Sequence, residues 1–312
     1  MSFNIHAYAN LGREGLGNIL VPWAKAELFS WKYGLPMLAP RWVHAKIGPL
    51  LRGERDKRYY YGLFDNSSYI RGIKRQLILW RATRLEPESY TRIISSNSQH
   101  LLNKPTIVEF KGMEGWHHIT EIKQRNYIQN RLLSIVSHSV KKALADDNDI
   151  NFLGVHVRRG DKTVLPYGAN RPIEAPWGCC FSNKWFATCI KSIRLSLGYT
   201  IPVKIFSDAR PEELGEIFQL GGVTLAKPNS SITDILIMSR ARILIPTSTS
   251  SFSLWASYLG GMPTIWYPGY QQTMREENSE FDSETDLLGN ISTEYGAILR
   301  SISTNKNLRF KT

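Results

Sequence analysis

Short apolar runs alternate along the second half of the chain with segments whose apolar residues recur at helical spacing. Four runs have the length and composition of buried strands: Ile150–Val157, Val203–Phe206, Arg242–Ile245 and Thr264–Trp266. The helical segments are Trp185–Leu197, a segment that begins at Pro211, Ile232–Ser239, Trp255–Leu259 and Thr285–Ile302. Because strands that alternate with helices form parallel sheets, this half predicts a doubly wound α/β domain.

The first half opens with the same alternation. A predicted strand at Phe3–Ala9 is followed by a glycine-rich turn, Gly12–Asn18, and then by apolar residues at helical spacing that stop at Gly34. Leu35–Leu38 reads as the next strand. The opening is therefore a strand, turn, helix and strand.

The halves meet at an acidic segment, Asp146–Asp149, which follows a helix predicted over Asn126–Ala145. A chain of 312 residues has enough material for two buried cores. We therefore predict two domains, residues 1–148 and residues 149–312.

Composition narrows the class of partner. Hydrophobic residues make up 42% of the chain and aromatic residues 11%, as in a folded globular protein. The net charge of +12, from 39 Lys and Arg against 27 Asp and Glu, favours nucleotides, nucleic acid or an anionic lipid surface. The chain lacks the interleaved aromatic residues of an RNA-recognition motif and the spacing of a zinc finger, which argues against nucleic acid.

The sequence also bears on the compartment. The N-terminus has no basic segment followed by an apolar core, and no apolar run approaches the roughly 18 to 20 residues that span a bilayer. We therefore expect a cytoplasmic protein, either soluble or peripheral at the inner face of the membrane. Cys179, Cys180 and Cys189 are odd in number and are joined by no histidine at metal-ligand spacing. This pattern favours a reducing compartment without structural zinc.

Arg71–Arg84 has the pattern of a basic amphipathic helix. Its apolar residues that can share one side are Ile73, Leu77, Ile78 and Trp80, with basic residues around them. Such a helix suits anionic lipid headgroups. The alternative is an ordinary domain helix with a solvated basic face.

Gly154–Lys162 reads G-V-H-V-R-R-G-D-K at the end of a predicted strand. His156, Arg158, Arg159 and Asp161 therefore fall at the edge where open α/β sheets bind ligands. Two adjacent arginines offer fixed charge and planar donor forks to a phosphate or pyrophosphate. The alternative is a salt bridge between Arg159 and Asp161.

Thr247–Ala256 reads T-S-T-S-S-F-S-L-W-A between a predicted strand and a predicted helix. Backbone amides and hydroxyls at the start of a helix suit phosphate oxygens. Plain N-capping by Ser251 or Ser253 is the alternative. An arginine-bearing strand end and a hydroxyl-bearing helix start within one domain together predict a diphosphate site.

Two further stretches carry candidate function. The turn G-R-E-G-L-G-N contains Gly15, Gly17 and Asn18 before a predicted helix, where backbone amides suit an anion. A tight bend alone also accounts for such glycines. Glu109–His118 combines glycines, carboxylates and paired histidines, a composition typical of functional loops.

Three motifs of the second half resemble those of the GDP-fucose-dependent fucosyltransferases. They are H-V-R-R-G-D at His156–Asp161, S-D at Ser207–Asp208, and D-I-L-I-M-S with T-S-T-S-S-F-S-L-W-A-S-Y-L within Asp234–Leu259. The set is most similar to the bacterial α-1,2 group and to its α-1,6 and protein-O relatives. The glycine-rich turn resembles the G-L-G-N-Q signature of the α-1,2 group and departs from it over Ile19–Val21.

The resemblance implies a GT-B fold, with two Rossmann-like domains that face a cleft. Residues 1–148 would take the acceptor side, and residues 149–312 would bind the GDP-sugar. Arg158 would hold the β-phosphate and the glycosidic oxygen, and His156 would contact the ribose or base. Arg159 would support the phosphates or lock the loop.

The same resemblance implies further donor contacts. Asp234 would accept hydrogen bonds from the guanine edge, and Ser250 and Ser251 would donate to the diphosphate. The remaining donor-binding candidates are Asp208, Gly15, Gly17 and Asn18.

Arg158 also fits on chemical grounds. Breaking the sugar–phosphate bond builds negative charge on the β-phosphate, which a positioned arginine stabilises by on the order of 100- to 1000-fold in rate. No D-x-D string lies in a strand-end loop, so no metal and no other cofactor is expected. Family members invert the anomeric centre, so a general base would assist the acceptor hydroxyl. Glu174 is the first candidate base and Asp161 the second.

The sequence therefore predicts an inverting, metal-independent transferase that moves L-fucose from GDP-fucose to a glycan hydroxyl. The acceptor would be a bacterial surface polysaccharide or its lipid-linked precursor, and an anionic membrane would be a further partner. Two alternatives remain open: a GT-B enzyme that uses another GDP-sugar, and a basic nucleic-acid-binding protein.

Overall fold

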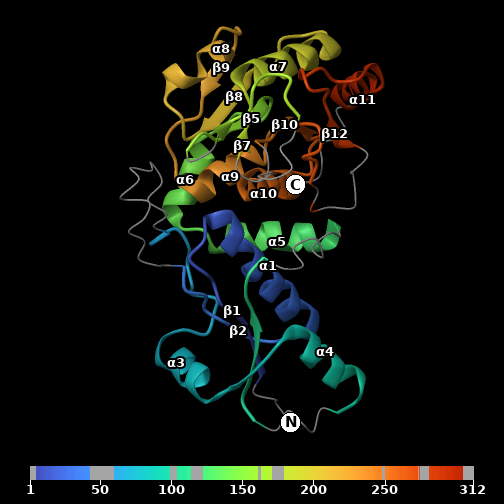
Figure 1. The fold of residues 1–312 in the computed structure, drawn as a ribbon. Helices are drawn as coiled ribbons and strands as arrows, with labels where there is room; N and C mark the ends of the chain where they lie inside the picture. Colours follow the sequence, from blue (N-terminus) through green and yellow to red (C-terminus); the bar gives the residue numbers. More distant parts are fainter. Residues whose placement is uncertain are drawn as a thin grey trace. The chain divides into compact units, whose positions relative to one another are not determined.

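The chain folds into two compact units, each with its own parallel sheet (Figure 1). The computed structural model describes residues 5–42, 60–98, 104–113, 122–160, 163–170, 179–247, 250–272, 274 and 281–304. Most residues up to Lys141 form the first unit, and the chain from Lys142 onward forms the second. The division lies within helix α6 (His138–Asp146) rather than in the acidic segment that follows this helix.

The first unit is built around a four-stranded sheet. Its elements in chain order are β1 (Ile5–Ala9), α1 (Leu16–Tyr33), β2 (Met37–Leu38), α3 (Gly72–Arg81), β3 (Thr83–Leu85), α4 (Pro87–Ser95), β4 (Thr106–Phe110), α5 (Ile122–Ile135) and the first residues of α6. The strand order is β2-β1-β4-β3, and every pair is parallel. The predicted opening is confirmed.

Helix α1 illustrates how local sequence sets the boundaries. Most of its apolar residues at helical spacing are buried, and Leu20 and Trp23 have no exposed surface, whereas Trp31 is 50% exposed. The helix stops at Gly34, whose φ of 62° lies in the left-handed region that glycine adopts without strain. The N–H of Gly34 donates to the carbonyl of Ser30. The predicted stop is therefore confirmed.

The second unit has a second parallel sheet, in the order β10-β5-β8-β9. Its elements in chain order are β5 (Leu153–Val157), β6 (Thr163–Val164), β7 (Cys179–Cys180), α7 (Asn183–Leu197), β8 (Val203–Ser207), a 3₁₀ turn (Pro211–Leu214), α8 (Gly215–Phe218), β9 (Val223–Leu225), α9 (Ser231–Met238), β10 (Ile243–Ile245), α10 (Ser251–Gly260), β11 (Ile265–Trp266), β12 (Ser283–Glu284) and α11 (Thr293–Thr304). The pairs β6–β7 and β11–β12 are also parallel.

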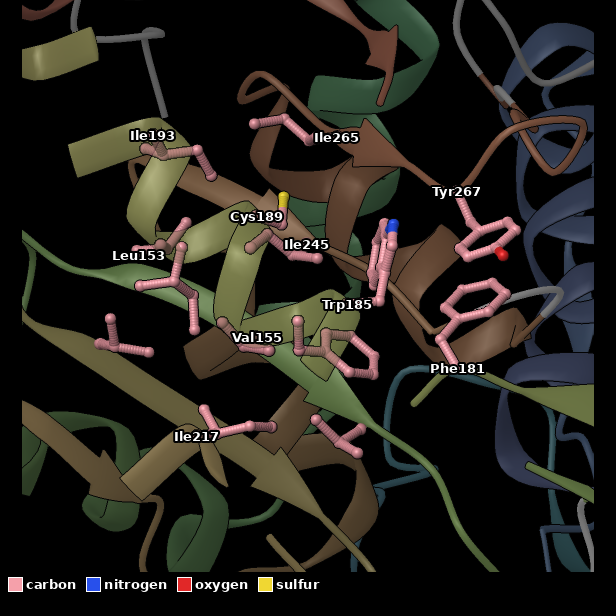
Figure 2. Close-up of a cluster of buried hydrophobic side chains, with 14 of the residues drawn as sticks. Leu153, Val155, Phe181, Trp185, Cys189, Ile193, Ile217, Ile245, Ile265 and Tyr267 are labelled. Carbon is pink, nitrogen blue, oxygen red and sulfur yellow. The ribbon is translucent and has the colours of Figure 1, made fainter. Parts of the chain in front are cut away.

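Strand β5 is buried on both faces, as is typical of a central parallel strand. Leu153 and Val155 point into a core that α7 supplies with Trp185, Cys189 and Ile193 (Figure 2). The other face of β5 packs closely, because a Cβ on Gly154 would lie 3.0 Å from the Cβ of Ala241. Side chains along a strand alternate between its two faces, and this alternation sets the face on which each functional residue near the end of β5 lies.

The single helix predicted over Asn126–Ala145 is wrong. The structure has two helices, α5 and α6, separated at Val136 and Ser137. Val136 forms an antiparallel bridge with Phe64, and the carbonyl of Ile135 accepts the N–H of Asp65 at 2.6 Å. Long-range backbone hydrogen bonds therefore engage the carbonyl of Ile135 and the N–H of Ser137, which donates to the carbonyl of Leu63, in place of helical hydrogen bonds.

Other elements also differ from the prediction. The last helix begins at Thr293 rather than Thr285, because Asp286 accepts the N–H groups of Leu288 and Asn290 and holds a turn there. The prediction also lacks β4 and the short strands β3, β6, β7, β9 and β12. Among the described residues, no helix is both long and apolar enough to cross a bilayer.

Candidate functional site

The topology of the second sheet marks one position where a ligand can bind. The chain runs from β5 outward to β8 and β9, and then returns across the sheet to β10 on the other side of β5. The strand order therefore reverses between β5 and β10. Parallel sheets bind ligands in the crevice at the carboxyl ends of the strands beside such a switch point. Arg158 follows β5 there, and Thr247 and Ser250 follow β10.

His156 joins β5 to the first turn of α10. Its ring is 8% exposed, and its Nδ1 lies 2.6 Å from Oγ of Ser253, a fully buried residue of α10. Burial, reinforced by the positive charge of Arg158, lowers the pKa of His156 to about 3. The ring is therefore neutral at physiological pH and fixes α10 beside the strand. Contact between His156 and a nucleotide stays a prediction.

The neutral state of His156 predicts a specific pH dependence of stability. The folded pKa lies below the ordinary value of 6.5, so the unfolded chain binds the extra proton as pH falls. The stabilisation is complete above pH 6.5 and is lost towards pH 3, by about 1.4 kcal/mol per pH unit. Between pH 7 and pH 5, the wild type should lose about 2 kcal/mol more than His156→Gln in urea unfolding.

A direct readout supports this test without relying on the variant. The imidazole NMR signals of His156 in the folded protein should not titrate between pH 8 and pH 5. A midpoint near 6.5, or equal pH dependence of unfolding in both proteins, would contradict a buried neutral ring.

Arg159 points to the opposite face from His156, as strand alternation requires. Its Nη1 donates to the carbonyl of Phe181 at 2.6 Å and contacts Sγ of Cys180 at 3.2 Å, and its Nη2 donates to Asn183. The guanidinium is thus engaged by the segment that leads into α7. The resemblance implies that Arg159 either supports the phosphates or locks the loop, and these contacts suit the second role.

Asp208 holds the turn that carries the two arginines. Its Oδ1 accepts the backbone N–H of Arg159 at 2.7 Å. Gly160 has a φ of 33°, and a Cβ at this position would lie 2.9 Å from Oδ2 of Asp208. Glycine is therefore required for the carboxylate to approach the backbone this closely. Asp208 positions the turn, and a direct contact with the donor stays a prediction.

Arg158 directly follows β5, and its Nε would lie 4.0 Å from a Cβ at Gly160, the position that Asp208 also approaches. Its side chain is half-buried, and its charge contributes to the lowered pKa of His156. The adjacent arginines thus differ in their surroundings, because Arg159 is held by the segment that leads into α7 whereas the charge of Arg158 acts on His156. Arg158 is the arginine placed with the β5–β10 switch point.

The start of α10 provides groups for an anion on the same side. Ser250 is the N-cap, and its side chain makes no capping hydrogen bond to the helix. The hydroxyl of Ser253 is taken by His156. The N-capping by Ser251 or Ser253 that the sequence allowed is therefore not what the structure shows. The helix dipole and the first-turn amides favour negative charge here.

Thr247 is a residue of this site that the sequence analysis did not single out. It is 1% exposed, and its Oγ1 has no hydrogen-bond partner among the described residues. A buried hydroxyl without a partner is costly unless a ligand or water satisfies it. Its position after β10, beside the end of β5, adds a third polar group to the switch point. In the sequence, the only signal for Thr247 was its place in the hydroxyl-rich run that begins with it.

Asp234 lies in the first turn of α9, where its charge favours the helix dipole. Ser230 caps this helix by accepting the N–H of Thr233. Oδ1 of Asp234 is shielded from solvent. Because α9 follows β9, the helix that carries Asp234 begins on the same carboxyl edge of the sheet. Recognition of guanine by Asp234 stays a prediction.

In the first unit, the glycine-rich turn leads into α1. Gly15 is the N-cap, and its φ of −65° is open to any residue. A Cβ at Gly15 would meet no atom within 4 Å. Backbone strain therefore does not explain why glycine occupies this position. Because Gly15 has no side chain, no side chain at this position covers the start of α1. Gly17 is buried and Asn18 half-buried in the first turn of the helix.

The first sheet has its own switch point, between β1 and β4. Glu109 lies there, 14% exposed at its side chain, and its Oε1 accepts from Nδ2 of Asn10 at 3.0 Å and from Nη1 of Arg84 at 2.5 Å. The composition of Glu109–His118 predicted a functional loop, whereas Glu109 belongs to β4. Asn10 and Arg84 were missed because only the strand order brings them together.

The two candidate bases, Glu174 and Asp161, lie outside the described residues, as do the paired histidines after Glu109. The described part of the chain contains no group of three or more His, Cys, Asp or Glu side chains arranged to hold a metal ion. Cys179, Cys180 and Cys189 are buried and form no disulfide.

Similarity to known proteins extends over much of the chain. The family model of Glycosyl transferase family 11 matches residues 83–288, more than half of the chain, and includes all three motifs of the second half. None of the curated proteins matches the chain.

Solved structures are similar in fold. The α-1,6-fucosyltransferase NodZ soaked with GDP-fucose matches with a TM-score of 0.52 at 13% identity, covering 84% of this chain and 95% of that one. NodZ from Bradyrhizobium gives 0.52 at 14%, covering 85% and 96%. The apo form of POFUT1 gives 0.52 at 13%, covering 86% and 99%. The likeness confirms the predicted GT-B-type fold, and the family match confirms the resemblance seen in the motifs. The chain belongs to glycosyl transferase family 11.

Proposed function

We propose that the protein transfers L-fucose from GDP-fucose to a hydroxyl group of a glycan, with inversion at the anomeric carbon. The observation that carries the proposal is the placement of Arg158 and the start of α10 at one switch point of the second sheet. Support for the donor comes from the motif resemblance, from the structure of NodZ soaked with GDP-fucose and from that of POFUT1 in complex with GDP-fucose.

The chemistry at this site is the stabilisation of a leaving group. The bond between the anomeric carbon and the β-phosphate oxygen breaks, while the acceptor oxygen bonds to the carbon from the opposite face. The departing GDP gains negative charge, which Arg158 and the α10 amides would stabilise where it develops. The acceptor proton passes to a base, for which Glu174 and Asp161 remain the candidates. A guanidinium in this role supports a reaction without a divalent metal.

The acceptor is proposed to be a surface polysaccharide or its lipid-linked precursor. On the first unit, Glu109 and Asn10 offer a carboxylate and an amide at the carboxyl edge of the sheet. Such groups recognise sugar hydroxyls through directional hydrogen bonds. We therefore assign acceptor recognition to this edge.

The donor is tested by a panel of nucleotide sugars. Saturation-transfer NMR should show binding of GDP-fucose with contacts to its C6 methyl group, and weaker binding of GDP-mannose and of UDP-sugars. Radiolabelled fucose should pass from GDP-fucose to an acceptor library, and excess EDTA should leave the rate unchanged. Preference for another GDP-sugar would replace fucose as the donor, and loss of transfer in EDTA, restored by Mg²⁺ or Mn²⁺, would contradict the metal-independent mechanism.

A further inference from the structure

Helix α3 of the first unit has two apolar faces instead of one. Ile78 is 9% exposed and packs with Tyr8, Leu38 and Ile107 against the sheet. The predicted helix is confirmed, but the prediction that Ile78 shares a side with the other apolar residues of α3 is wrong. At 100° per residue, Ile78 lies on the far side of the helix from the midpoint of the group formed by Ile73, Leu77 and Trp80.

The second apolar face points to solvent. Ile73, Leu77 and Trp80 are spaced by four and three residues, which places them in one stripe along the helix. Ile73 is 81% exposed, Leu77 45% and Trp80 79%. A single exposed apolar residue is ordinary, whereas an exposed stripe that contains a tryptophan marks an interaction surface.

The stripe is held in a fixed orientation. Nε of Arg75 donates to the carbonyl of Ala39 at 2.7 Å, and its Nη2 donates to Oη of Tyr8 at 3.3 Å. The guanidinium also lies 5.4 Å from the centre of the Tyr8 ring. These contacts anchor α3 beside the sheet of the first unit (Figure 1). The exposed side chains are therefore presented by an ordered helix.

The charge around the stripe has one sign. The segment Arg71–Leu85 contains five basic residues and no acidic residue. Lys74 and Arg81 are exposed and lie on one flank of the stripe, and the guanidinium of Arg81 lies 5.6 Å from the centre of the Trp80 ring. A tryptophan flanked by cations suits the boundary between anionic headgroups and acyl chains.

We propose that α3 docks the protein on an anionic lipid bilayer, with Ile73, Leu77 and Trp80 inserted at the headgroup level and Lys74 and Arg81 on the lipid phosphates. A protein partner suits the surface less well. Three side chains amount to a few hundred Å², whereas a stable interface takes roughly 800 Å² from each partner. The proposal holds for any donor sugar, and it places the enzyme where a lipid-linked acceptor is found.

The test measures binding of the full chain to vesicles. Flotation with phosphatidylcholine vesicles that contain 30% phosphatidylglycerol should recover the protein at low salt, and pure phosphatidylcholine should recover much less. Ile73→Ser combined with Trp80→Ser should weaken partitioning at least about tenfold. Lys74→Glu combined with Arg81→Glu should weaken it at least about 25-fold, since each lost cation costs about fivefold.

Matched controls come from α7, whose Leu195 is 84% exposed and whose Lys191 is also exposed. Leu195→Ser and Lys191→Glu should retain binding, and all variants should retain transfer to a soluble acceptor. That transfer assay separates a failure of docking from a failure of the proposed reaction. Equal recovery of wild type and the α3 variants would overturn the proposal. So would self-association in sedimentation velocity that the α3 variants abolish, in a protein that binds no vesicles.

Discussion

Arg158→Lys should lower kcat/KM for transfer by on the order of 100- to 1000-fold, while the thermal stability of the protein stays close to that of the wild type. The guanidinium offers a planar fork of donors to the β-phosphate, and an ammonium group replaces this fork with a point charge. The change keeps the positive charge, so a large loss would report donor geometry rather than net charge. Steady-state kinetics with GDP-fucose, beside a thermal melt of each protein, makes the measurement.

The neighbouring residue provides the matched control. Arg159→Lys removes the guanidinium N–H groups that donate to Phe181, Cys180 and Asn183, so it should destabilise the fold by about 1–3 kcal/mol. Activity per folded molecule should change much less than in Arg158→Lys. Near wild-type turnover in Arg158→Lys, or an equal loss of activity per folded molecule in both variants, would remove the special role of Arg158.

Asp234→Ala should weaken binding of GDP by about 10- to 100-fold and leave binding of UDP almost unchanged. A carboxylate that accepts hydrogen bonds from the guanine edge contributes on the scale of a charged hydrogen bond, and uracil offers a different pattern of donors. Isothermal titration calorimetry with the two nucleotides separates base recognition from binding of the diphosphate, which both share.

Thermal melts of Asp234→Ala and of the wild type separate a loss of nucleotide binding from a loss of stability. Asp234 lies in the first turn of α9, so its loss weakens the interaction with the helix dipole by about 0.3–1 kcal/mol. Asp234→Asn serves as the companion variant, because it preserves size while it removes the charge. Equal losses for GDP and UDP would show that Asp234 supports the site without reading the base.

The strands and helices of the second unit were predictable because their apolar periods are local. The run before Arg158 reads as a strand and is confirmed, and the helix predicted over Trp255–Leu259 lies within α10, which begins earlier, at Ser251. The motif pairing also placed Arg158 and the serine-rich segment in one domain. What the sequence did not reveal is the strand order, which puts β10 beside β5 and creates the switch point.

The remaining differences arise from contacts between residues far apart in the sequence. The break between α5 and α6 depends on the pairing of Val136 with Phe64. The difference between the surroundings of the two arginines depends on the contacts of Arg159 with Asn183 and Asp208, which lie later in the chain. Periodicity indicated α3, but only the packing of Ile78 on Leu38 shows which of its apolar residues are covered. In each case a partner at long range decides the outcome, and a local pattern does not contain that partner.

The account depends on Arg158 and the start of α10 enclosing the same pyrophosphate at the carboxyl ends of β5 and β10. A crystal structure of the complex with GDP measures this directly. The account predicts the β-phosphate within hydrogen-bond distance of the Arg158 guanidinium and of backbone amides in the first turn of α10. A nucleotide bound elsewhere, or held at this edge without contact to Arg158, would contradict it.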